Sequence, residues 1–222
     1  MSPDTDLKPV MTFLAKLTKN NDRTWFEAHR QDYETARLLF MSFVQELIDG
    51  LNRFEDMRGV TPKDCVMRIY RDVRFSKDKS PYKTGMSASL GPGGRKSYGF
   101  QYYIHLEPGG RSMVAGGLHE PEPAQLNAFR ANISRDARDF KAKVGAKAFR
   151  QYFGDVSGER LKTAPQGYDR AHAEIELLRL KEVVAVHKLA DDVVVAPGLG
   201  AHVVKACAAM KPFLDYLRVA TG

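Results

Sequence analysis

The residues best suited to chemistry lie in one cationic stretch, residues 68–84, which reads RIYRDVRFSKDKSPYKT. Six of its side chains are cationic and two are acidic, so it carries four of the seven net positive charges of the 222-residue chain. Arginine presents a planar fork that matches a carboxylate or a phosphate, and lysine adds a mobile point charge. The stretch therefore predicts a binding site for an anion.

The predicted ligand-binding residues are the cations of this stretch, one acid that orients them, and tyrosines that can hydrogen bond or stack. They are Arg68, Arg71, Asp72, Arg74, Lys77, Lys79, Tyr82, Lys83 and, from a later strand, Tyr103. The alternative interpretation is a solvated loop with structural Arg–Asp pairs, since runs of charge are usually exposed to water. The sequence shows no nucleophile elbow, paired catalytic carboxylates or Cys–His set, so the catalytic residues, if the protein has any, stay unknown at this point.

A strand over residues 66–75 is expected to position the first half of the stretch, because V-M-R-I-Y-R-D-V-R-F is rich in β-branched and aromatic residues. Alternation places Arg68, Asp72 and Arg74 on one face and leaves Arg71 on the apolar face. An unpaired cation there costs on the order of several kcal/mol. We therefore expect Arg71 to pair with an acid, cap a helix or escape through a bulge.

The motif R-x-Y-R-D-x-R-F-S-K-D-K-x-P-Y-K, residues 68–83, resembles the signature of a family of conserved hypothetical proteins, the domain-of-unknown-function 2461 family. Three further segments support the resemblance: NNDRTWF at residues 20–26, GGLHEP at 116–121 and LLRLK at 177–181. The resemblance covers most of the chain. It implies one family fold over that length, and it implies no mechanism or cofactor.

Residues 8–55 are predicted to be helical, with one long helix over about residues 23–54, because apolar residues recur there at steps of three and four. Residues 63–120 are predicted to form the core of a sheet. Within it, residues 98–107 and 111–119 read as a hairpin around Gly109 and Gly110. Tyr103 and His105 would face away from the core, and Gly116 and Gly117 suggest a bulge or a close backbone approach.

The remaining residues, 121–222, are predicted to be helical and mixed. Helices are expected over residues 121–152, 174–180 and 197–217, a strand over 182–187, and a kink or break at Pro212. The order of these elements predicts the α+β class. We expect a single globular domain with an antiparallel or mixed sheet of about four or more strands and helices packed on it.

Two familiar kinds of site are excluded. The glycine-rich residues 91–97 lack the spacing of a phosphate-binding P-loop, since Arg95 stands where a glycine is required, and a mobile loop is predicted there instead. His105 and His119 would lie on the order of 16 Å apart in the hairpin. No metal site is predicted.

The net charge of +7 makes anionic partners plausible. The favoured partner is a phosphorylated or polycarboxylate small molecule bound by residues 68–83. A nucleic-acid-binding module is the alternative, supported by the many cations of residues 130–150, and a structural or protein-interaction domain without catalytic activity is the third.

The chain is also expected to be cytoplasmic and to have no membrane partner. Cys65 and Cys207 do not form a disulfide framework. The first residues do not read as a signal peptide, and no apolar run approaches the ~20 residues that span a bilayer. The sequence does not indicate the oligomeric state or whether a reaction is catalysed.

Overall fold

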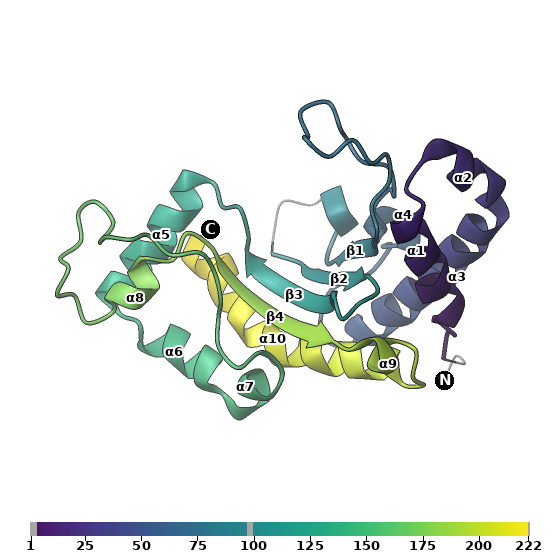
Figure 1. Ribbon diagram of the computed structural model, residues 1–222. Coiled ribbons are helices and arrows are strands. Elements are labelled where there is room, and N and C mark those ends of the chain that lie inside the picture. Colours follow the sequence, from purple (N-terminus) through teal and green to yellow (C-terminus); the bar gives the residue numbers. More distant parts are fainter. Residues whose placement is uncertain (1–3, 97–99, 222) are drawn as a thin grey trace. The chain divides into compact units, whose positions relative to one another are not determined.

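The computed structural model describes residues 4–96 and 100–221, and the order of its elements can be followed in Figure 1. The strands are β1 Met86–Leu90, β2 Tyr102–Leu106, β3 Ser112–Leu118 and β4 Val183–Leu189. The helices are α1 Lys8–Lys19, α2 Arg23–Ala28, α3 Arg30–Leu51, α4 Pro62–Cys65, η1 Gly94–Lys96, α5 Pro123–Arg135, α6 Arg138–Gly145, α7 Lys147–Phe153, α8 Ile175–Leu178, α9 Asp191–Val194 and α10 Leu199–Thr221.

The strands form one antiparallel sheet in the order β1-β2-β3-β4, which confirms the predicted α+β fold. The predicted hairpin is also present as β2 and β3, although Tyr98 lies outside the described residues. Burial alternates along β2, where Tyr102, Ile104 and Leu106 are buried. The residues between them, including Tyr103 and His105, are half-buried on the other face.

The chain divides into two compact units, and each has its own core. Among the described residues, unit 1 comprises residues 4–96, 103–114 and 188–205, and unit 2 comprises residues 100–102, 115–187 and 206–221. In unit 1, α1 buries Val10, Phe13, Leu14 and Leu17, and α3 buries Phe40, Phe43, Leu47 and Leu51.

The single helix predicted over residues 23–54 is wrong, because the chain breaks between α2 and α3 at His29. Asp22 starts α2 as an N-cap, accepting a hydrogen bond from the Trp25 backbone N–H at 2.9 Å. The His29 ring then stacks on Trp25 at 4.1 Å between centroids. The apolar stripe continues across the break, which is why periodicity did not reveal it.

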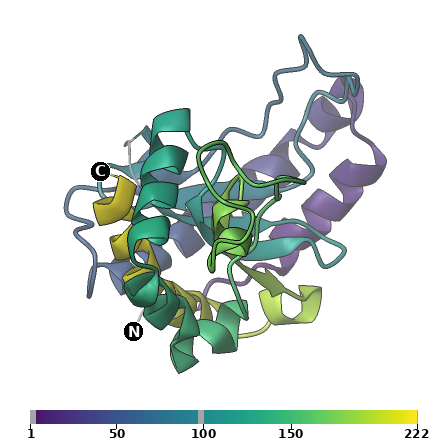
Figure 2. The same ribbon diagram turned by 90° about the vertical axis from the view of Figure 1, so that its left-hand side faces the viewer.

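The strand predicted over residues 66–75 is also wrong. Only Val66 and Tyr70 form isolated bridges, with Ala88 and Tyr82. Beyond Arg71 the chain becomes a loop, residues 72–80, which projects from the rest of unit 1 in Figures 1 and 2. Hydrogen bonds from the backbone to aspartate side chains stabilise turns in this loop and prevent the strand that the residue types favour. Asp72 accepts from the Arg74 N–H at 3.2 Å, and Asp78 accepts from the Ser80 N–H at 2.9 Å.

Unit 2 packs helices around buried phenylalanines from α5, α6, α7 and α10, among them Phe129, Phe140, Phe149 and Phe213. The predicted helix 121–152 is divided into α5, α6 and α7. In Figure 1, α10 lies along β4. A kink or a break was predicted at Pro212, and the break is wrong, because α10 continues through this residue.

Close packing explains the two glycines of β3. A β-carbon at Gly116 would clash with Met210 Sδ of α10, and one at Gly117 would clash with the Val183 carbonyl of β4. Gly117 also has a φ of 132°. The predicted close backbone approach is therefore confirmed. None of the helices in the described part of the chain is both long enough and apolar enough to cross a bilayer.

Candidate functional site

The cationic motif folds back on itself as an irregular pair of extended segments. The backbone N–H of Met67 donates to Ser87 O at 2.9 Å, that of Lys83 to Ile69 O at 2.8 Å, and that of Arg71 to Pro81 O at 3.0 Å. Residues 66–71 therefore run antiparallel to residues 81–88. This arrangement places the two ends of the motif side by side and opens two cavities in unit 1.

The first cavity, which we call the Arg68 hollow, has a volume of about 250 Å³. It lies between α3, the motif and η1. Its lining residues are Tyr33, Arg37, Phe40, Met41, Lys63, Val66, Met67, Arg68, Ile69, Tyr70, Gly85, Met86, Ser87 and Arg95.

The Arg68 hollow is strongly cationic. Four of its described lining residues are cations (Arg37, Lys63, Arg68 and Arg95), and none is acidic. Arg37 lies 3.6 Å from Glu34, which is outside the hollow, and Arg95 donates to the Lys63 backbone carbonyl. Arg68 has no carboxylate within ion-pair distance in the described part of the chain. Arg68 thus gives the hollow a positive charge that no described carboxylate neutralises.

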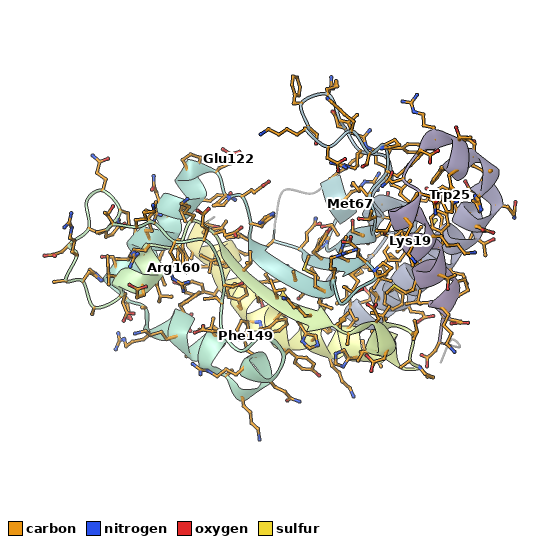
Figure 3. All side chains as sticks on the ribbon, in the orientation of Figure 1. Lys19, Trp25, Met67, Glu122, Phe149 and Arg160 are labelled. Atoms are coloured by element: carbon orange, nitrogen blue, oxygen red, sulfur yellow. The ribbon has the colours of Figure 1, made fainter. Side chains whose placement is uncertain are left out.

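The second cavity, the Lys83 groove, has a volume of about 470 Å³. Met67, which Figure 3 labels, lines both cavities together with Gly85 and Ser87, so the two adjoin. The groove is lined by Thr18, Asn21, Met67, Arg71, Asp78, Ser80, Tyr82, Lys83, Thr84, Gly85, Ser87, Tyr103, His105 and Glu107.

A chain of hydrogen-bonding groups forms one wall of the Lys83 groove. Tyr103, His105 and Glu107 alternate along β2 and its end, so they share one face. His105 Nε2 lies 2.8 Å from Glu107 Oε2, and His105 Nδ1 lies 3.4 Å from the Tyr103 hydroxyl. Carboxylate, imidazole and hydroxyl thus stand in series.

Glu107 is held in place on both oxygens. Its Oε1 accepts from the Thr84 hydroxyl at 2.7 Å and lies 3.0 Å from Arg111 Nε, while Oε2 faces His105. Burial alone would raise the pKa of Glu107, but hydrogen bonds from His105 and Thr84 and the charge of Arg111 outweigh it and lower the pKa. Glu107 is therefore ionised at neutral pH, with a fixed orientation.

A glycine makes room for the imidazole. A β-carbon at Gly85 would lie 2.6 Å from His105 Cε1 and 2.9 Å from the Leu106 carbonyl oxygen. These distances are closer than a β-carbon tolerates, so Gly85 lets the His105 ring lie against the neighbouring backbone. Residues 83–85 therefore place Lys83 and Thr84 in the lining of the groove, and Gly85 leaves the space that the His105 ring occupies.

Lys83 is half-buried in the groove, and burial, assisted by the charge of Arg68, lowers its pKa. No carboxylate lies within ion-pair distance of it among the residues that the structure places. Arg71 is different, because it pairs with Asp78 and donates to the Ser76 hydroxyl at 3.3 Å. Of the three outcomes expected for Arg71, pairing with an acid is the one observed, although no strand forms there.

The nine predicted ligand-binding residues are divided among three places. Arg68 lines the hollow, and Arg71, Tyr82, Lys83 and Tyr103 line the groove. The other four, Asp72, Arg74, Lys77 and Lys79, line neither cavity.

Several side chains of the loop, residues 72–80, form hydrogen bonds within the loop itself. The Arg74 guanidinium donates two hydrogen bonds to Asp72, at 3.0 and 2.7 Å, beside the one from the Arg74 backbone. The hydrogen bonds from Arg74 are the main cause of the lowered pKa of Asp72. Arg68 affects Asp72 only through its charge, so Asp72, which was expected to orient the cations of the stretch, holds Arg74 and not Arg68. Lys79 donates to the Val73 carbonyl at 3.0 Å.

Sequence reasoning missed His105, Glu107 and Thr84 as site residues, and Arg37, Lys63 and Arg95 as further cations. The spacing Y-x-H-x-E over residues 103–107 was a usable signal, since alternation puts all three side chains on one strand face. Thr84, Lys63 and Arg95 lie in other segments, and only the fold brings them to the site.

The cysteines are not candidates for nucleophiles. Cys65 and Cys207 are buried and are not joined in a disulfide, and burial raises the pKa of Cys65 to about 11. A thiol with so high a pKa is protonated at neutral pH and unreactive. In the described ranges, no group of three or more His, Cys, Asp or Glu side chains is placed to hold a metal ion.

Comparison with known proteins adds a family. Neither a search of curated proteins nor a search of solved structures found a match. A family model described as "Conserved hypothetical protein (DUF2461)" matches residues 9–216, almost the whole chain, and the protein therefore belongs to this family.

Proposed function

We propose that the protein binds a small ligand through an anionic group, a phosphate or one carboxylate of a polycarboxylate, seated in the Arg68 hollow. The observation that carries the proposal is the hollow's lining of four cations and no acid. Arginine and lysine side chains are the usual partners of such anions. Tyr33 and Tyr70 line the same hollow and add hydroxyl groups.

The rest of the ligand extends into the Lys83 groove, because the two cavities share Met67, Gly85 and Ser87. Lys83 lies at this side with its charge unpaired by any described carboxylate, so it serves the ligand as a further cation. Arg71, Tyr82 and Tyr103 line the path. We place the protein in the cytoplasm, a proposal supported by its two buried cysteines, which are not joined in a disulfide.

The test is a binding measurement with inorganic phosphate, phenyl phosphate, glutarate and citrate at ~50 mM salt, where screening is modest. We expect at least one of these anions to raise the melting temperature of the wild type. Arg68→Met should weaken that binding by about ten-fold or more, because a hydrogen bond to a charged group contributes roughly 1.5–3 kcal/mol.

Arg150→Met is the matched control. Arg150 is an exposed arginine of α7, outside both cavities, so its loss changes the net charge equally and should leave binding unchanged. Equal weakening in both variants would show only a general charge effect. If none of the anions shifts the wild-type melting temperature, the proposal is wrong and the structural or protein-interaction alternative is favoured.

A further inference from the structure

The wall of the Lys83 groove contains groups that anion binding does not require. An anion is held by cations, yet this wall places Glu107, His105 and Tyr103 in series and shields them, with His105 18% and Glu107 16% exposed. A base within reach of a hydroxyl, itself oriented by a third group, is the arrangement that activates oxygen nucleophiles. Distances slightly longer than ideal are common when no substrate is bound.

The hydrogen bonds determine which nitrogen of His105 can accept a proton. An ionised carboxylate only accepts hydrogen bonds, so the nitrogen that faces Glu107 at 2.8 Å, Nε2, must carry a proton. In the neutral imidazole, Nδ1 then has the free lone pair. That nitrogen is the one beside the Tyr103 hydroxyl, in the wall of the groove.

We propose that the Lys83 groove hydrolyses a carboxylic ester whose substrate also carries an anionic group, with His105 as the general base and Glu107 as the residue that positions it. The proposal rests on the proposed function, because the anionic group is the one bound in the Arg68 hollow. Arg68 is then the anchor, and the ester lies next to it in the groove.

The reaction is balanced with water as the only co-reactant. His105 Nδ1 takes a proton from a water molecule while the water oxygen bonds to the acyl carbon. The tetrahedral intermediate collapses, the bond between the acyl carbon and the alkoxy oxygen breaks, and the imidazolium returns its proton to that oxygen. The Tyr103 hydroxyl donates to Nδ1 in the resting site. Once water takes that place, the hydroxyl donates instead to the oxygen that gains charge.

The charges of the two cavities favour an acyl group over a phosphoryl group as the reacting centre. The groove contains Asp78 and Glu107 as well as Arg71 and Lys83, so its described lining is balanced and would repel part of a phosphoryl group's charge. A neutral ester meets no such repulsion. The hollow instead has four cations and no acid in its described lining, so it would hold the charged tail of the substrate.

The test uses p-nitrophenyl hydrogen glutarate, an ester with a carboxylate tail, beside neutral p-nitrophenyl butyrate and p-nitrophenyl phosphate. We expect wild-type kcat/KM to be about ten-fold or more higher for the glutarate ester than for the butyrate ester. His105→Gln should lower kcat by about 100-fold or more, the range for general base catalysis, and should leave glutarate binding intact.

His119→Gln is the matched control, since His119 also pairs with a glutamate, Glu182, at 2.7 Å but lies outside the groove with 71% of its side chain exposed. It should leave turnover unchanged. Wild-type turnover no faster than that of His105→Gln would overturn the proposal, as would preferred hydrolysis of the phosphate ester. Glutarate binding without hydrolysis would leave the anion site standing, whereas loss of both would remove the proposed function as well.

Nitrogen NMR of the wild type tests the same assignment without any variant. The neutral His105 ring should carry its proton on Nε2, and Glu107→Gln should shift the ring toward a mixture of the two tautomers. A proton on Nδ1 in the wild type would rule out the proposed base.

Discussion

Arg71 shows how one cation can decide the course of the surrounding backbone. Its side chain is 26% exposed, and its guanidinium contacts Asp78 and Ser76 across the base of the loop of residues 72–80. Hydrogen bonds from Ser80, and then from Arg71, lower the pKa of Asp78. The acid that Arg71 requires therefore comes from seven residues further along the chain, which closes the loop and ends the extended segment.

Arg71→Ala should consequently lower the melting temperature, and Lys77→Ala should leave it nearly unchanged. Partly exposed ion pairs contribute up to about 1 kcal/mol, which corresponds to a shift of roughly 2–4 °C in a protein of this size. Lys77 is exposed, and it forms no ion pair with any described carboxylate. Differential scanning fluorimetry of both variants is sufficient, and equal, negligible shifts would contradict a structural role for Arg71.

At the scale of elements, the entry into β1 controls the groove. Gly85 stands where the extended segment of residues 81–85 becomes a strand, with its backbone against His105 and Leu106 of β2. The Thr84 hydroxyl reaches Glu107 from the preceding residue. The His105–Glu107 pair is thus held in place by Thr84 and Gly85, which directly precede the neighbouring strand β1.

Gly85→Ala should both destabilise the protein and disturb this pair, because its β-carbon would lie 2.9 Å from the Leu106 carbonyl oxygen, which cannot move without breaking the sheet. Overpacking of this kind costs about 1–3 kcal/mol. Gly145→Ala in α6 is the control, since nothing lies within 4 Å of a β-carbon there, and alanine favours helix.

Thermal melts and the NMR signal of the His105 ring separate the two effects in these variants. Gly85→Ala should lower the melting temperature and move the ring signal, whereas Gly145→Ala should keep or raise the melting temperature and leave the signal in place. An unperturbed ring in Gly85→Ala would show that the close approach has no influence on the site.

The same elements show what sequence could and could not predict. The β2–β3 hairpin was predictable, because alternating apolar residues and the Gly109–Gly110 turn are local signals. The strand over residues 66–75 was predicted from propensity and did not form, since Asp72 and Asp78 accept hydrogen bonds from the backbone N–H groups of Arg74 and Ser80, two residues further along. The contacts of Thr84 and Gly85 with β2 are long-range, and no local pattern encodes them.

Over the whole molecule, the net charge of +7 is less available to partners than its size suggests. The cations of residues 130–150 supported a nucleic-acid interface, but several are already engaged. Arg130 is buried and donates to the Leu178 and Leu180 carbonyls at 2.8 and 2.9 Å, and burial lowers its pKa. Arg138 pairs with Asp136, Lys141 with Glu174 and Lys143 with Asp139.

The loop of residues 72–80 carries the remaining feature that suits nucleic acid. Phe75 is 96% exposed and lies 5.9 Å from the Arg74 guanidinium, so it could stack on a base. One such stack contributes roughly 1–3 kcal/mol, whereas micromolar affinity requires about 8 kcal/mol. Several phosphate contacts would have to supply the difference, and Asp72 and Asp78 already occupy Arg74 and Arg71.

We therefore expect no binding of single- or double-stranded DNA or RNA oligonucleotides by micromolar protein at ~150 mM salt, measured by fluorescence anisotropy. Any association at ~50 mM salt should be weak and should disappear as salt rises, because phosphate contacts release counterions. Phe75→Ala separates base stacking from phosphate contacts as the cause of any binding, since it removes the stacking ring and keeps the charge. Binding that survives ~150 mM salt and is lost in Phe75→Ala would contradict this prediction and would make the loop a nucleic-acid interface.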